Sequence, residues 1–267
     1  ITQAVIDKSL PRLQIISKYG IGLDKINVDY ATKKGLPVLF TPGVNHTTVA
    51  EHTFGLLLGI TKDIQSNAVA VQNGEWVAGW KKPVGNEIMG KTIGILGLGR
   101  IGKEVAIRAR AFGMSIIAFD PYFDDSFASE NGVKRCSSMN EVLHNSDVVS
   151  LHCFLNDETE DMINAAKIAE MRDQVIVLNC ARGELVNTKD MADALKSGKV
   201  GGYGADVLDA EPPAPGHVLI GAPNCIITSH IGSRTHESVQ RQANRCLNNA
   251  INFFSGAEDV LCANGVL

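Results

Sequence analysis

Residues 92–102 read TIGILGLGRIG, an apolar run followed by three glycines, Gly97, Gly99 and Gly102, in the spacing G-x-G-x-x-G. The apolar run predicts a buried strand, and residues 101–112 have the apolar spacing of a helix. Such a turn between a strand and a helix is typical of dinucleotide-binding proteins. The first glycine permits the tight turn, the second lets the backbone approach a pyrophosphate, and the third lets the helix pack closely on the strand.

The residues around this turn indicate which dinucleotide it binds. The first N–H groups of the helix, at Arg100 and Ile101, are expected to face the phosphates. The next predicted strand ends at Asp120, which is 120 − 102 = 18 residues after the last glycine. A carboxylate there accepts hydrogen bonds from a ribose diol and repels a 2′-phosphate. The pattern therefore favours NAD over NADP, whereas a glycine turn without a ligand would leave the acid and the flanking elements unexplained.

The rest of the chain repeats the alternation of strand and helix. Continuously apolar strands need cover on both faces, which is typical of a parallel sheet in a doubly wound α/β fold. Strands are predicted at 13–17, 37–40, 92–96, 115–119, 147–152, 175–179, 204–207 and 226–228. Helices are predicted at 29–34, 101–112, 164–171, 188–197 and 236–254, with residues 47–71 helical but long for one helix and residues 76–90 a loop.

The composition is that of an ordinary globular protein. Of the 267 residues, 45 % are hydrophobic and 20 % charged, which excludes a disordered tail, a collagen and a coiled coil. The net charge of −4 gives no reason to expect nucleic acid or an anionic membrane as a partner. No apolar run reaches the about 18 residues of a membrane helix, and no secretory signal pattern opens the chain. Six cysteines without a C-x-x-C pair predict reduced thiols and a cytoplasmic location.

Three later strands end in polar segments, at residues 179–183 (NCARG), 206–212 (DVLDAEP) and 228–232 (TSHIG). Because ligands of open parallel sheets bind at the carboxyl ends of the strands, these segments are expected to converge on the cofactor. Hydride transfer to a 2-keto acid leaves an alkoxide that needs a proton, and a histidine supplies or removes protons near neutral pH.

We therefore predict that His230 exchanges the proton, that Glu211 orients its ring, and that Arg182 clamps the substrate carboxylate. Each has an alternative explanation when taken alone: a satisfied loop histidine, a solvated turn and a helix cap. The functional interpretation rests on all three following a dinucleotide fingerprint. The cofactor is also expected to contact three neighbours of these residues, with Asp206 accepting a hydrogen bond from its carboxamide: Cys180, Ala181 and Asp206.

Other chemistries lack their motifs. No His, Cys, Asp or Glu cluster has metal-ligand spacing, so no metal is predicted. The absence of G-x-S-x-G and of a P-loop argues against a hydrolase or a kinase. His152 is expected to pack in the interior or behind the site. Surface positions are expected for four other histidines: His52, His144, His217 and His236.

The chain resembles the D-isomer-specific 2-hydroxyacid dehydrogenases. The resemblance rests on GLGRIG, Asp120, NCARG, DVLDAEP and SHIG, and on residues 17–43 and 45–52. The resemblance covers essentially the whole chain and is greatest to the phosphoglycerate dehydrogenase-like branch. It implies a Rossmann NAD-binding domain, at 48–233, inserted into a smaller flavodoxin-like substrate-binding domain, at 1–47 and 234–267. The first strands and helices of the smaller domain are expected to precede Ile1. A homodimer built through the cofactor domain is also implied.

The resemblance assigns the catalytic roles to Arg182, Glu211 and His230. It further implies that the backbone N–H groups at Tyr19, Gly20 and Ile21 bind the substrate carboxylate. Two more expectations concern single residues: Thr48 lies near the cofactor, and Ser229 stands where the family usually has proline.

The expected activity is NAD-dependent oxidation or reduction of a small D-2-hydroxy acid or 2-keto acid. 3-Phosphoglycerate is one candidate substrate, and its phosphate would need nearby cationic groups such as Lys18, His46 and Arg234. Glyoxylate, hydroxypyruvate and D-lactate are alternatives. A more remote alternative is an NAD-sensing corepressor of the C-terminal binding protein type.

Overall fold

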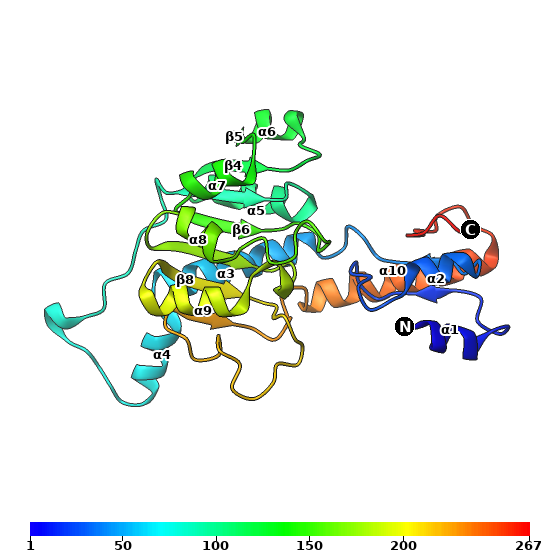
Figure 1. Ribbon diagram of the computed structural model, residues 1–267, viewed down its shortest axis with the longest axis horizontal. Coiled ribbons are helices and arrows are strands. Elements are labelled where there is room, and N and C mark those ends of the chain that lie inside the picture. The colour runs from blue at the N-terminus through cyan, green and yellow to red at the C-terminus, as the bar shows by residue number, and fades with distance from the viewer. The chain divides into compact units, whose positions relative to one another are not determined.

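The computed structural model covers residues 1–267 and describes all of them except the side chain of Trp80 (Figure 1). It divides into two compact units. We call residues 47–232 the central unit, and residues 1–46 together with 233–267 the terminal unit. The units change after residues 46 and 232, whereas the sequence analysis expects the domains to change after residues 47 and 233.

The central unit is built on a seven-stranded sheet in which all neighbouring strands are parallel. Its strand order is β5-β4-β3-β6-β7-β8-β9, so the chain winds outward from β3 in one direction and from β6 in the other. Ligands of such sheets bind at this switch point, beside the carboxyl ends of the two strands. The expected doubly wound Rossmann sheet is confirmed. The strands are β3 (Thr92–Leu96), β4 (Ser115–Phe119), β5 (Val133–Arg135), β6 (Val148–Leu151), β7 (Val175–Asn179), β8 (Val200–Ala205) and β9 (Cys225–Ile227).

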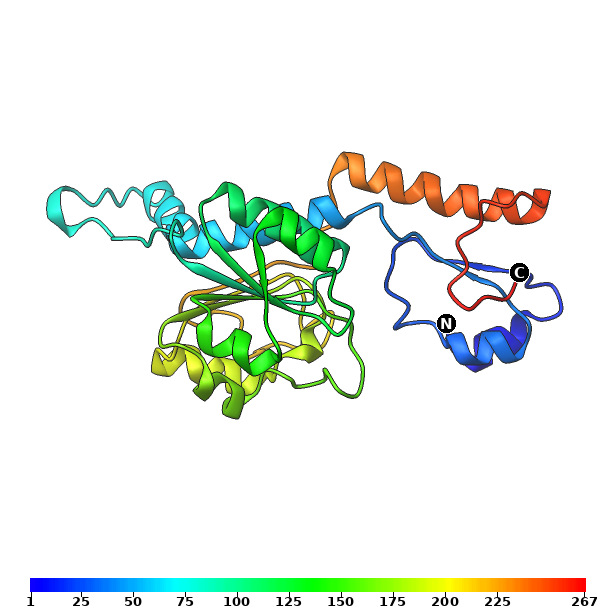
Figure 2. The ribbon, with the colours of Figure 1, turned by 90° about the horizontal axis from the view of Figure 1, so that it is seen from above.

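Helices cover both faces of this sheet (Figure 2). One hydrophobic core lies under α3, α5 and α6, and a second lies under α7, α8 and α9. Burial on both faces explains why the strands are apolar throughout, as Ile93 and Ile95 of β3 show by being fully buried. The helices are α3 (His46–Thr61), α4 (Ile64–Gln72), α5 (Arg100–Ala111), α6 (Asp125–Asn131), α7 (Met139–Asn145), α8 (Ala165–Glu170) and α9 (Thr188–Ser197), with short 3₁₀ turns η1 (Gly79–Lys81) and η2 (Gly183–Leu185).

The structure corrects some of the predicted elements. The long helical pattern at 47–71 forms two helices, because Asp63 adopts a left-handed conformation with φ of 50° between α3 and α4. Strand β8 begins at Val200, four residues before the predicted start. Gly202 and Gly204 lie in this strand, and the lack of a side chain at either position leaves room for α3 to approach. The sequence prediction also missed several short elements: α1 (Gln3–Ser9), α6, α7 and β5.

The terminal unit contains two parallel strands, β1 (Ile16–Ser17) and β2 (Val38–Leu39). Residues 261–263 pair antiparallel with the other edge of β2, where the Ala263 N–H donates to the carbonyl of Val38 at 2.7 Å. Buried Asn249 bridges the same segments, since it donates to the Phe40 carbonyl and accepts from the Leu261 N–H. The helices of this unit are α1 (Gln3–Ser9), α2 (Val28–Lys33) and α10 (His236–Ser255).

No helix in the described part of the chain is both long enough and apolar enough to cross a membrane.

Candidate active site

The glycine turn between β3 and α5 has the geometry that a bound pyrophosphate requires. Gly97 has a φ of 97°, and a Cβ there would come within 2.7 Å of the backbone of His152. A Cβ on Gly102 would lie 2.1 Å from the carbonyl oxygen of Gly97. At Gly99 a Cβ would meet nothing within 4 Å, so this side of the turn is open. Gly99 caps α5 without a side chain, which leaves the first N–H groups of the helix for an anionic ligand.

Asp120 lies directly beside this turn, at the end of β4. One carboxylate oxygen accepts from the Leu98 N–H at 2.6 Å, and the other accepts from the Tyr122 N–H at 2.7 Å. These bonds fix the carboxylate at the rim of the turn, and each oxygen keeps a lone pair for a ribose hydroxyl. Lys103 pairs with Asp124 at 2.5 Å instead of offsetting the charge of Asp120.

The loop after β7 places Arg182. Fully buried Asn179 accepts from the Ala181 N–H at 3.1 Å and donates to the Arg182 carbonyl at 2.8 Å, which holds the loop closed. The Arg182 guanidinium donates to the Ala181 carbonyl at 2.6 Å. A Cβ on Gly183 would lie 1.9 Å from the carbonyl carbon of Leu208. The arginine loop therefore lies directly against the loop after β8.

The loops after β8 and β9 bring an acid and an imidazole together. His230 Nδ1 lies 2.7 Å from Glu211 Oε2, and the other Glu211 oxygen accepts from the Leu208 N–H at 3.2 Å. With a carboxylate facing Nδ1, that nitrogen carries a proton and Nε2 remains available for proton exchange. The side chains of His230 and Glu211 are 50 % and 37 % exposed, so a ligand can reach them.

His230 has a left-handed backbone, with φ of 55°, which costs a non-glycine residue about 1–2 kcal/mol. The carboxylate of Asp206 holds the turn that contains it. Asp206 accepts from the Thr228 hydroxyl at 2.6 Å and from the N–H groups of Ile231 and Gly232 at 2.8 Å and 2.6 Å. Hydrogen bonds to a charged group contribute about 1.5–3 kcal/mol each, so together they outweigh the backbone strain.

Asp206 itself is 3 % exposed. Burial alone raises the pKa of its carboxyl, but the nearby His52 ring and the hydrogen bonds from Thr228 and the two backbone N–H groups outweigh burial and lower the pKa. Asp206 is therefore ionised and already engaged by the turn. Its predicted bond to the nicotinamide carboxamide stays a prediction.

The expectation that His52 and His217 lie at the surface is wrong. The His52 side chain is 21 % exposed, and its Nε2 lies 2.8 Å from Thr228 Oγ1 and 3.4 Å from Asp206 Oδ1. The His217 side chain is 9 % exposed and pairs with Asp209 at 2.9 Å. The sequence does contain a signal for His52, because Leu56 and Gly59 follow it at helical spacing on the buried face of α3.

Cys180 and His152 are partly buried, and both side chains are neutral at pH 7. Burial raises the pKa of the Cys180 thiol to about 12, so it is not a nucleophile at neutral pH. Burial lowers the pKa of His152 to about 3, and its Nε2 bonds the Ser150 hydroxyl at 2.7 Å. His152 is thus an interior residue, as expected. Among the described residues, no group of three His, Cys, Asp or Glu side chains is arranged to hold a metal ion.

The predicted carboxylate loop, Tyr19 to Ile21, belongs to the terminal unit. The Gly20 N–H donates to the Thr41 hydroxyl at 3.0 Å, so this amide already has a partner, which follows β2 in the same unit. Anion binding by the amides of Tyr19 and Ile21 stays a prediction. Thr48, which is 5 % exposed, lies in the first turn of α3.

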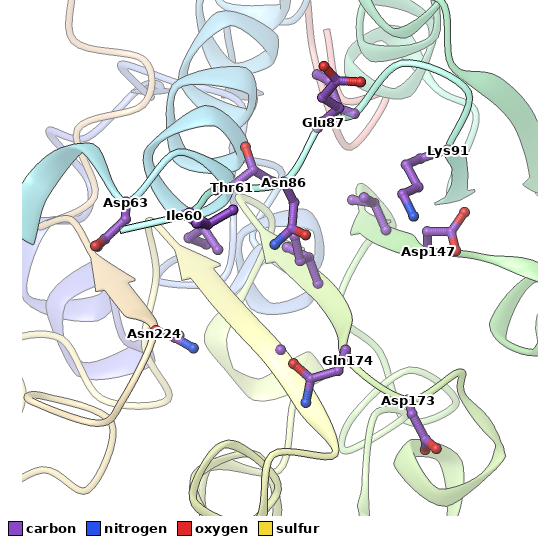
Figure 3. Close-up of a pocket in the computed structure, with 16 residues that line it drawn as sticks. Ile60, Thr61, Asp63, Asn86, Glu87, Lys91, Asp147, Asp173, Gln174 and Asn224 are labelled. Carbon is purple, nitrogen blue, oxygen red and sulfur yellow. The ribbon is translucent and has the colours of Figure 1, made fainter. Parts of the chain in front are cut away.

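Two pockets of the central unit lie at opposite ends of its strands. One of about 410 Å³ is lined by Asp147, Gln174 and Gly201, at or beside the amino ends of β6, β7 and β8 (Figure 3). Ligands of open α/β sheets bind at the carboxyl ends, so this pocket is not the cofactor site. The other, of about 470 Å³, is lined by Glu211 and His230 with neighbouring apolar groups, and lies at the carboxyl ends of β8 and β9.

Comparison with known proteins identifies the family. Residues 54–232 match the family model described as D-isomer specific 2-hydroxyacid dehydrogenase, NAD binding domain. The chain is 39 % identical to a D-3-phosphoglycerate dehydrogenase of Methanocaldococcus jannaschii, over 89 % of this chain and 45 % of that protein. It is 40 % identical to a hydroxypyruvate reductase of Thermotoga maritima, over 86 % of this chain and 74 % of that protein.

A crystal structure of D-lactate dehydrogenase from Aquifex aeolicus, in complex with NAD and lactic acid, superposes with a TM-score of 0.90. It is 31 % identical and matches 99 % of this chain and 84 % of that one. The chain spans about half the length of some of the curated relatives it matches, such as the 45 % and 48 % of two phosphoglycerate dehydrogenases. The cofactor of the matched domain is NAD, and the chain belongs to the D-isomer-specific 2-hydroxyacid dehydrogenase family.

Proposed function

We propose that the protein transfers a hydride between NAD and the C2 carbon of a small D-2-hydroxy acid or 2-keto acid. The observation that carries this proposal is the His230–Glu211 pair, 2.7 Å apart, at the carboxyl end of the sheet that also holds the glycine turn. A dinucleotide on that turn extends along the carboxyl ends of the strands, toward the loops after β7, β8 and β9.

Bound NADH would supply the hydride for reduction of a keto acid. His230, protonated at Nε2, gives its proton to the oxygen at C2, and in the reverse direction the neutral ring takes that proton back. Glu211 orients the ring through Nδ1 and stabilises the imidazolium. Arg182 offers its guanidinium to the substrate carboxylate and places the C2 carbonyl for attack.

The substrate we favour is 3-phosphoglycerate or its 2-keto product. One support is the 39 % identity to a D-3-phosphoglycerate dehydrogenase over 89 % of this chain. Two candidate cationic groups for a phosphate, Lys18 and Arg234, lie in the terminal unit. Lys18 donates to the Tyr19 carbonyl at 3.0 Å, within the loop expected to bind the substrate.

Initial rates with NADH test both the keto-acid reductase activity and the choice of substrate. The keto acids to compare are 3-phosphohydroxypyruvate, hydroxypyruvate, glyoxylate and pyruvate. The highest kcat/KM for the phosphorylated acid supports the phosphoglycerate assignment, and a higher value for another acid replaces it. Folded protein that binds NADH but reduces none of the four contradicts the proposed activity.

Asp120→Asn is expected to reduce the preference for NAD over NADP, because it removes the negative charge but keeps one amide oxygen for the Leu98 N–H. Loss of the charged acceptor for the ribose diol should weaken NADH binding about 10- to 100-fold. Fluorescence titration with NADH and NADPH measures both effects. Asp125→Asn, on an exposed side chain of α6, is the matched control. An unchanged NADH-to-NADPH affinity ratio would show that Asp120 does not select the cofactor.

We also propose that two copies associate through α4 and residues 73–90, which extend away from the sheet in both views (Figures 1 and 2). Helix α4 buries none of its residues. Large apolar side chains of this segment are exposed, including Val69 at 49 %, Trp76 at 74 % and Val84 at 94 %. Apolar exposure on this scale is typical of an interface. The six free cysteines fit a reducing compartment, which supports a cytoplasmic location.

Sedimentation velocity is expected to give the mass of a dimer for the unmodified chain. The double variant Val69→Glu and Val84→Glu should sediment as a monomer, because it would place charges in an apolar contact. Tyr122→Glu, on a side chain that is 93 % exposed outside this segment, is the control and should remain dimeric. A monomeric unmodified chain would contradict the proposal.

A further inference from the structure

We propose that His52 is a positioning residue, which holds the turn of His230 through a hydrogen-bonded chain across Thr228 and Asp206. This inference rests on the proposed function, because it concerns how the proton-exchanging imidazole is held. All four residues belong to the central unit. Nothing in the family comparison assigns a role to His52.

Helix α3 gives His52 a rigid support. Leu56 and Ile60, four and eight residues after His52, lie on the same face of the helix. That face lies directly on β8, since a Cβ on Gly204 would be 3.0 Å from Leu56 and one on Gly202 would be 2.4 Å from Ile60. The bare glycines thus let the helix approach the strand at close range, and the position of His52 relative to the strand ends is fixed by packing.

The donor of each hydrogen bond between His52, Thr228 and Asp206 can be assigned from the acceptors. Ionised Asp206 can only accept, so the Thr228 hydroxyl donates its one proton across 2.6 Å to Asp206. The carbonyl of Ala205, at 3.5 Å, is a much poorer acceptor for it. Thr228 Oγ1 must then accept from His52 Nε2, at 2.8 Å. The order of donation is therefore from His52 to Thr228 to Asp206.

These hydrogen bonds lead from His52 to the turn that carries His230. Asp206 accepts the N–H groups of Ile231 and Gly232, the two residues that follow His230. The His52 ring also forms a wall of the turn, since a Cβ on Gly232 would lie 3.3 Å from its Cδ2 atom. His52 thus supports the turn both by packing and by its N–H donor, without touching the reacting atoms.

Two substitutions separate these contributions. His52→Phe keeps a ring against Gly232 but removes the donor, and is expected to lower kcat about 10- to 100-fold through misplacement of His230. The KM for NADH should not change, because the glycine turn is untouched. His52→Gln places an amide N–H near the position of Nε2 and is expected to recover most of the lost kcat. His144→Phe, on an exposed side chain of α7, is the matched control and should behave as wild type.

A double-mutant cycle with Thr228→Val tests whether His52 acts through the hydroxyl of Thr228. Adding His52→Phe to Thr228→Val should lower kcat little further if the two act in series. Full kcat in His52→Phe overturns the proposal, as does a loss in His52→Gln as large as that in His52→Phe, because packing alone would then explain the effect. Thermal unfolding shows whether each variant is folded.

Nuclear magnetic resonance of the ligand-free protein gives a readout that does not depend on turnover. The Nδ1–H signal of His230, assigned by its loss in His230→Ala, should shift in His52→Phe and return toward its wild-type position in His52→Gln. An unchanged signal in His52→Phe contradicts the positioning role even if the enzyme proves inactive on every substrate tested. Inactivity of the unmodified chain together with a shifted signal would contradict only the proposed function.

Discussion

Replacement of His230 by alanine is expected to lower kcat for keto-acid reduction by about 10²- to 10⁴-fold, the range that a general acid contributes. The His230–Glu211 pair lies at the carboxyl ends of β8 and β9, and its half-exposed imidazole can be reached by a ligand. NADH affinity should be unchanged, because the residues around the glycine turn do not contact His230. Stopped-flow reduction under single-turnover conditions, with a parallel fluorescence titration of NADH, measures the two quantities.

Chemical rescue distinguishes loss of proton exchange from general damage. Free imidazole in the assay should restore part of the activity of His230→Ala, because the exposed site leaves room for it. It should have no effect on the control His144→Ala, which removes a surface imidazole from α7. A His230→Ala variant that retains wild-type kcat would assign the proton transfer to another group and would refute the mechanism.

The glycine turn and the pairing of Glu211 with His230 could be predicted, the first from a local motif and the second from where two neighbouring strands end. Three glycines, a flanking strand and Asp120 describe one local unit, and its conformation follows from backbone freedom and spacing. Glu211 and His230 follow the adjacent strands β8 and β9 and therefore lie at the same edge. The shared edge of the two neighbouring strands is thus enough to bring Glu211 and His230 together.

The role of His52 could not be predicted in this way. It lies 176 residues from Thr228, and the helical spacing of α3 indicates that His52 is on a buried face but not which strand end that face meets. The close packing of α3 on β8 depends on the bare backbone at Gly202 and Gly204, and the predicted strand began only at Gly204. The engagement of Asp206 was missed for the same reason, because its partners lie on another strand end and on α3. Packing between distant segments decided these contacts.

Arg182→Lys is expected to be the second most damaging change, lowering kcat/KM for the keto acid about 10²-fold or more. Lysine keeps the charge but offers a point donor where a carboxylate is held best by two parallel N–H groups. The loss should fall mainly on the KM of the keto acid if Arg182 only binds, and on kcat as well if it also orients the carbonyl for hydride attack. Steady-state kinetics with the keto acid varied at saturating NADH measure this division.

The arginine loop allows a control that separates charge from loop structure. Asn179 holds the backbone on both sides of Arg182 through its side-chain amide, so the loop is fixed without the guanidinium. Arg182→Met should therefore leave the melting temperature unchanged while it abolishes the anion clamp. If Arg182→Met still binds the keto acid with wild-type KM, the carboxylate is held elsewhere, and the amides of Tyr19 and Ile21 become the groups to test.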